Sequence, residues 1–175
     1  MKRIYIKSFL GLLLLFSISS CEDFLNPVPV DLLIDDLALN EPGDVPSVEI
    51  GLYSRARLLG APGVIAGDMT SDLLIHNGTF NQYRELGNKE ITSSNASAAS
   101  LWGAIYGTIY VANFILERLP EIIGVPQDQR ENVMATARFW RGYAYFVAVT
   151  TFGDVPLVVN TDIEVNRNIP RTPIA

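Results

Sequence analysis

The chain has 175 residues, of which 49% are hydrophobic, 18% charged and 10% aromatic, a composition that excludes a disordered or collagen-like chain. The one cysteine, Cys21, and the one histidine, His76, exclude an internal disulfide, a cysteine zinc cluster and a multi-histidine centre, so we predict no metal and no cofactor. The net charge of −6 disfavours nucleic acid as a partner, because an acidic surface repels phosphates.

The first 20 residues are typical of a signal peptide. Basic residues within the first seven positions precede an apolar run over 9–18, which is too short to cross a hydrocarbon core of about 30 Å. The run leads into a segment that resembles a bacterial lipobox, Ile18-Ser19-Ser20-Cys21. We therefore expect removal of residues 1–20 and lipidation of Cys21, with acyl chains that hold the protein on a membrane. The alternative is a cleaved signal peptide followed by an incidental cysteine.

Residues 21–44 are predicted to form a tether. Pro27 and Pro29 prevent a regular helix in this segment. Glu22 and Asp23 resemble the signal that sends many Bacteroidetes lipoproteins to the outer face of the outer membrane. The alternative for these two acidic residues is that they only keep the tether solvated.

Apolar residues at spacings of three and four predict helices in the remainder of the chain. The first helix begins at Asp44, and Gly60 followed by Pro62 is expected to stop it. Residues 61–100 form the least regular stretch, in which 65–75 is predicted to include a short helix or strand.

Two longer helices are predicted after this stretch. The second begins at Ser97 or Ser100 and ends at Pro120, and the third covers 126–150. The short linker between them predicts an antiparallel pair, which is the unit of tetratricopeptide (TPR) arrays. An extended piece is expected at 157–159. The predicted fold class is therefore mainly all-α, with TPR-like helix pairs and long irregular loops.

Short motifs along the chain occur in a definite order. They are the opening CEDFLNP at 21–27, the helical segments at 101–116 and 137–146, the turn FGDVPLV at 152–158 and the loop PRTP at 170–173. Together these segments resemble the motifs of the SusD/RagB family of outer-membrane nutrient-binding lipoproteins. The chain departs from the family pattern at Thr136, Trp140 and Gly142, where we expect packing to change more than function.

Members of this family are much longer than 175 residues. We therefore expect the chain to represent only the N-terminal portion, from a truncated gene, a partial sequence or a deliberate fragment. The expected division is a signal peptide at 1–20, a lipidated N-terminus and tether at 21–44, and a partial SusD-like, TPR-containing domain at 45–175. A TPR-like pair normally buries its outer face against the next pair, so partial exposure is expected for Phe139, Tyr143, Tyr145 and Phe146.

The resemblance implies a surface-exposed, lipid-anchored outer-membrane protein that binds oligosaccharides for uptake with a TonB-dependent transporter. Sugar binding needs aromatic faces together with amide, acid or guanidinium groups. The irregular stretch offers six such candidates, Asn77, Asn81, Gln82, Tyr83, Arg84 and Asn88. The alternative is that these side chains only hold the loop together. The helical spacing of Trp102 and Trp140 favours core packing instead of sugar stacking.

Two other functions stay open at this point. The first is a TPR-like adaptor that contacts the transporter without binding glycan itself. The second is a hydrolase using Asp68 and Asp72, which are four residues apart and would share a helix face. A single carboxylate pair is far more typical of a solvated face or a cap, so we predict no enzyme and no catalytic residues.

Overall fold

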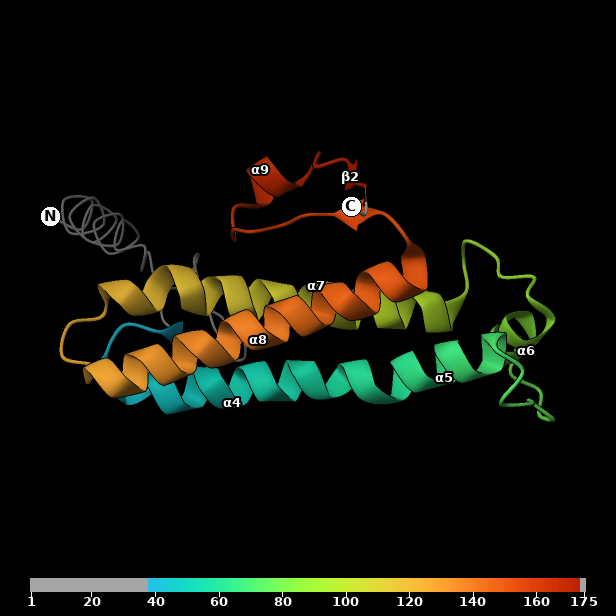
Figure 1. The fold of residues 1–175 in the computed structure, drawn as a ribbon, viewed down its shortest axis with the longest axis horizontal. Helices are drawn as coiled ribbons and strands as arrows, with labels where there is room; N and C mark the ends of the chain where they lie inside the picture. The colour runs from blue at the N-terminus through green and yellow to red at the C-terminus, as the bar shows by residue number, and fades with distance from the viewer. Residues whose placement is uncertain (1–37, 174–175) are drawn as a thin grey trace, which may run out of the picture. The chain divides into compact units, whose positions relative to one another are not determined.

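The computed structural model describes residues 38–173, and these form mainly helices (Figure 1). The signal peptide at 1–20, Cys21 and the first part of the tether lie outside the described residues. The main helices and strands are α4 (Val45–Ala56), α5 (Gly60–Thr70), α6 (Asn81–Asn88), α7 (Ala96–Arg118), α8 (Gln127–Phe152), β1 (Val155–Pro156), α9 (Ile163–Asn166) and β2 (Arg171–Thr172). The mainly all-α prediction is therefore confirmed.

The prediction that Gly60 and Pro62 stop the first helical stretch is wrong. The chain passes through a 3-10 turn, Arg57–Leu59, and continues directly as α5 (Figure 1). Pro62 is the third residue of α5. A proline is tolerated in the first turn because the N–H that it lacks would have no partner inside the helix.

The predicted antiparallel pair is formed by α7 and α8, which lie side by side (Figure 1). A proline turn, Leu119–Glu121, follows α7, and the guanidinium of Arg130 on α8 donates hydrogen bonds to the carbonyls of Leu119 and Ile122. Both acceptors lie in the linker after α7, so these bonds attach the linker to α8. The linker between α7 and α8 is therefore held in place by a residue of the helix that follows it.

The hydrophobic core runs along α7 in two clusters. One cluster includes Leu52 of α4 and Ile115 of α7, and the other includes Ile105 and Ile109 of α7 with Ala148 of α8. By length and composition α7 with its following turn is able to span a membrane, but half of this stretch is buried by the surrounding helices. Trp102 and Trp140 pack against the two clusters, as predicted.

The segment after α8 folds back along the helix pair. The Tyr145 hydroxyl donates to the carbonyl of Val158 (2.8 Å) and accepts from its N–H (2.7 Å). The buried amide of Asn113 donates to the Val158 carbonyl and accepts from Arg141. The strand β1 pairs antiparallel with β2. The strand β1 lies just before the predicted extended piece at 157–159. That piece is held chiefly by the side chains of Tyr145 and Asn113.

The outer side of α8 carries an exposed row of aromatic rings. Phe139 and Phe146 are 63% and 60% exposed, and Tyr143 between them is 43% exposed. Tyr145 is half-buried, consistent with the predicted partial exposure, and its hydroxyl bonds to Val158. We call the set formed by Tyr53, Phe139, Trp140, Tyr143 and Phe146 the α8 aromatic face.

Candidate functional site

The candidate site is built around α6, a helix of eight residues between the end of α5 and the start of α7. Lys89, which ends α6, and Asp72, which follows α5, both have left-handed backbones, with φ of 61° and 68°. The Lys89 ammonium reaches both carboxylate oxygens of Asp72, at 2.9 and 3.1 Å. Left-handed residues other than glycine are uncommon and cluster at functional sites, which directs attention to this end of the unit.

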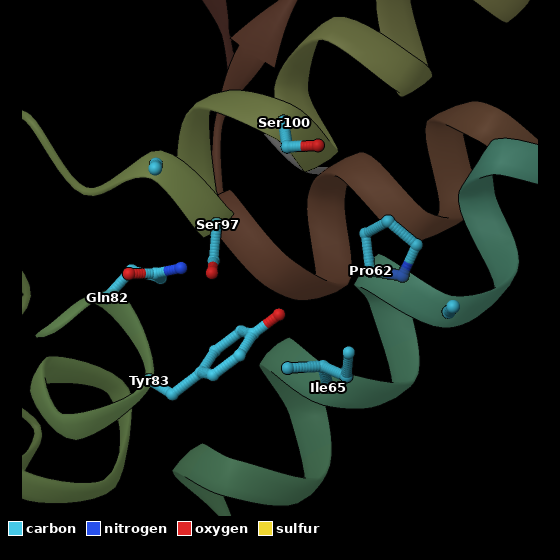
Figure 2. A pocket seen from close by; sticks show the side chains of 8 residues that line it. Pro62, Ile65, Gln82, Tyr83, Ser97 and Ser100 are labelled. Atoms are coloured by element: carbon cyan, nitrogen blue, oxygen red, sulfur yellow. The ribbon is translucent and has the colours of Figure 1, made fainter. Parts of the chain in front are cut away.

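A first cavity of about 270 Å³ opens between α5, α6 and the start of α7. Figure 2 shows the Tyr83 ring extending from α6 toward α5, with its hydroxyl near the space between Ile65 and Ser97. The first cavity is lined by small, apolar and polar side chains, which are those of Ala61, Pro62, Ile65, Gln82, Tyr83, Ala96, Ser97 and Ser100. The cavity thus offers one aromatic ring with amide and hydroxyl groups around it.

A second cavity of about 220 Å³ lies between the loop after α5 and α6, and Tyr83 lines it as well. His76 and Phe80 contact the Tyr83 ring in edge-on arrangements, with ring centroids 5.3 and 5.9 Å away. The polar lining comes from Asp72, His76, Arg84 and Asn88. Tyr83 therefore stands at the boundary of both cavities, and both have apolar and hydrogen-bonding walls.

Four of the six predicted ligand residues line these cavities. Gln82 and Tyr83 line the first, and Tyr83, Arg84 and Asn88 line the second. The other two, Asn77 and Asn81, are exposed and line neither cavity. The side-chain oxygen of Asn81 instead accepts a hydrogen bond of 2.6 Å from Arg84, so it orients that guanidinium.

Sequence reasoning missed several lining residues. Ser97 and Ser100 were recognised only as possible starts of a helix, but on the first turns of α7 they form one wall of the first cavity (Figure 2). His76, predicted to be a loop residue, does lie in the loop before α6, where its Nε2 accepts from the Phe80 N–H at 3.2 Å. No local pattern marks it as a cavity residue, because its neighbour Tyr83 is seven residues away.

The hypothetical carboxylate pair does not share a helix face. The helix α5 ends at Thr70, so Asp72 lies beyond it and is ion-paired with Lys89, while Asp68 remains on the helix. Within residues 38–173, no group of three His, Cys, Asp or Glu side chains is placed to hold a metal ion. The contacts described in the site are hydrogen bonds, aromatic contacts and the Asp72–Lys89 ion pair.

A helical unit with aromatic and amide-lined cavities between its helices defines a protein suited to ligand binding. Residues 49–174 match the SusD-like family, described as starch-binding and associating with the outer membrane. Because this match covers most of the chain, the chain belongs to the SusD-like family. The resemblance to SusD-like proteins stated from the motifs is confirmed.

Two relatives come from Formosa agariphila. SusD-like protein P25 is 28% identical over 154 residues, which cover 82% of this chain and 29% of the relative. SusD-like protein P2 is 24% identical over 154 residues, which cover 84% of this chain and 30% of the relative. The chain thus spans about 30% of the length of these relatives. No solved structure matches the chain.

Proposed function

We propose that the protein is a surface-exposed outer-membrane lipoprotein that binds oligosaccharides without chemically changing them. Family membership supports this role, since the family is described as starch-binding and associating with the outer membrane. The observation that carries the proposal is the half-buried Tyr83 ring, flanked by two cavities whose walls hold amide, hydroxyl and guanidinium groups. An aromatic face with surrounding hydrogen-bonding groups is the chemistry that recognises a sugar ring.

The size of the cavities favours a chain of sugars over a compact ligand. Pockets for drug-sized molecules are about 300–1,000 Å³, whereas these cavities are about 270 and 220 Å³ and adjoin through one residue. Each suits a single ring. We infer that an oligosaccharide occupies both, with consecutive rings on either side of Tyr83 and with Gln82 and Arg84 bonded to their hydroxyls.

The test is an array of immobilised neutral and uronate-containing oligosaccharides, with starch-derived maltoheptaose among them. We expect the purified protein to be retained and Tyr83→Ala to lose at least about tenfold in apparent affinity, equivalent to about 1.4 kcal/mol. The matched control is Tyr143→Ala, an exposed tyrosine on α8. Equal retention of the Tyr83→Ala variant would place glycan binding elsewhere.

We further propose that Cys21 carries the lipid anchor and that a TonB-dependent transporter is the partner. Cys21→Ser should release the protein from the membrane fraction, because the acyl chains supply the attachment. Unchanged fractionation would disprove the lipoprotein assignment. Co-purification of the lipidated protein with an outer-membrane transporter tests the second part.

The alternative proposal is an adaptor that contacts the transporter without binding glycan. It is favoured by the α8 aromatic face, because large exposed aromatic groups are common at protein interfaces. This alternative would be supported by two results together. The protein would bind no sugar on the glycan array, and its co-purification with the transporter would be lost in the double variant Phe139→Ser/Phe146→Ser. Co-purification that survives this double substitution would remove the α8 aromatic face as its basis.

A further inference from the structure

A buried asparagine joins the two polar walls of the first cavity. Asn95 is 3% exposed, and all four hydrogen-bonding positions of its amide are used. Its oxygen caps α7 by accepting from the N–H groups of Ser97 (3.0 Å) and Ala98 (3.1 Å). Its nitrogen donates to the Gln82 carbonyl (3.0 Å) and to the Glu85 carboxylate (2.9 Å), both on α6.

The helix α6 depends on such external contacts. Isolated helices shorter than about 12–15 residues are marginal in water, and α6 has eight residues with no side-chain cap at its N-terminus. Leu86 is its buried hydrophobic side chain. The same Glu85 oxygen that meets Asn95 also accepts from the N–H and hydroxyl of Thr92. The polar network thus attaches α6 to the loop and to the start of α7.

We propose that Asn95, acting with Glu85, is a positioning residue that sets the distance between Gln82 and Tyr83 on α6 and Ser97 and Ser100 on α7. Neither Asn95 nor Glu85 lines the first cavity, so their effect on binding is exerted through the cavity walls. This inference rests on the proposed glycan site. It goes beyond that proposal by separating residues that contact sugar from residues that hold the site in shape.

The ionised form of Glu85 suits this role. The amide of Asn95, followed by the hydroxyl and N–H of Thr92, lowers the pKa of Glu85, and the charge of Arg84 lowers it further. A depressed pKa means that the network stabilises the folded site above the ordinary glutamate range and is lost as pH falls through the lowered pKa. The wild-type site should therefore loosen in acid.

The substitution Asn95→Asp separates positioning from capping. Aspartate is as good a helix cap as asparagine, so the bonds to Ser97 and Ala98 are kept. The amide nitrogen, whose two N–H groups donate toward α6, becomes one carboxylate oxygen that faces the Gln82 carbonyl and the Glu85 carboxylate. We expect faster amide hydrogen exchange in α6, unchanged exchange in the first turn of α7, and about tenfold weaker retention on the oligosaccharide array.

Two further readouts distinguish positioning from general loss of structure. In Asn95→Asp, retention should recover as pH falls, because a proton shared by the two carboxyls restores a donor, whereas wild-type retention weakens in acid. The double variant Asn95→Asp/Glu85→Gln should recover retention at neutral pH, because the new amide donates in the opposite direction. Asn132→Asp, the same chemical change at an exposed position on α8, is the matched control.

The outcomes are decisive. Unchanged α6 exchange in Asn95→Asp, or faster exchange with full retention on the array, would overturn the inference. Failure of the wild-type protein to bind any array sugar would instead reject the proposed function. The exchange measurement would then still decide whether Asn95 holds α6 against α7, since it needs no sugar.

Discussion

The α7–α8 pair and α6 are both helical, but different forces hold them in place. The pair is long, and the fully buried residues Ile105 and Ile109 of α7 and Ala144 and Ala148 of α8 lie in one core cluster. The helix α6 has one buried side chain, Leu86, and its other contacts include the hydrogen bonds of Asn95 to Gln82 and Glu85 and the Lys89–Asp72 ion pair. The comparison indicates that a core of buried apolar residues supports a short helix whose position depends largely on polar contacts.

The strongest test of this comparison is a cavity in the core. Ile109→Ala should lower the free energy of unfolding by about 2–5 kcal/mol, because the fully buried side chain leaves an unfilled space. Ile123→Ala, at a residue that is 92% exposed in the linker, should change it little. Urea unfolding followed by circular dichroism measures both. Similar effects of the two variants would contradict the assigned core.

A smaller effect is expected where polar bonds support the helix pair. Tyr145→Phe removes a hydroxyl that bonds to both the carbonyl and the N–H of Val158, so we expect a loss of about 1–3 kcal/mol. Tyr143→Phe on the exposed side of the same helix is the control. The same urea measurement applies. A loss as large as that of Ile109→Ala would show that polar bonds and apolar burial contribute equally to the pair.

A third prediction concerns alkaline pH. Burial, together with the nearby Tyr145, raises the pKa of Tyr106 to about 12, from an ordinary value of 10.0. The unfolded chain therefore loses this proton first, and stability should decline as pH rises from 10 toward 12. The ring is partly exposed, so we expect a modest slope. Tyr106→Phe should flatten it in pH-dependent thermal melts, and an unchanged slope would assign the decline to other groups.

The smallest effect is expected at the ion pair beside α6. Lys89→Met should lower the free energy of unfolding by less than about 1 kcal/mol, since both partners are exposed. The difference from wild type should shrink in about 1 M salt, where exposed charges are screened. Urea unfolding at low and high salt measures this. A large loss that shrinks in salt would mean that this ion pair stabilises α6 more than an exposed pair normally does, whereas a large, salt-independent loss would assign the effect to packing of the Lys89 side chain.

The difference between apolar burial and polar attachment also explains which helices could be predicted from the sequence. The helices α7 and α8 were placed within a few residues of their observed ends, because their apolar residues recur at helical spacing. The helix α6 was predicted to be a loop, because Asn81–Asn88 is polar and contributes one buried leucine. Its helical state depends on contacts with distant residues. Similarly, α5 was obscured by Gly60 and Pro62, whose effect depends on where the preceding helix ends.

The sequence predicted which types of side chain form the candidate site, but not how these side chains are arranged in space. The side-chain types suited to sugars singled out Gln82, Tyr83 and Arg84, which line the cavities, and Asn77, which does not. Spacing along the chain cannot distinguish these cases without knowledge of α6. Asn95 was not singled out, because in the sequence it is one of several Asn and Gln residues that mark a loop, although it also caps α7. Its second role depends on the position of Glu85, ten residues earlier.

The contacts at Val158 also determine where the chain can change length. From the left-handed turn at Gly153, the chain reaches Pro156, which accepts a hydrogen bond from Tyr106, and then Val158, which is bonded on both sides to Tyr145. One inserted or deleted residue within 154–157 would move Val158 off its partners. Related chains are therefore expected to keep a constant length between Gly153 and Val158.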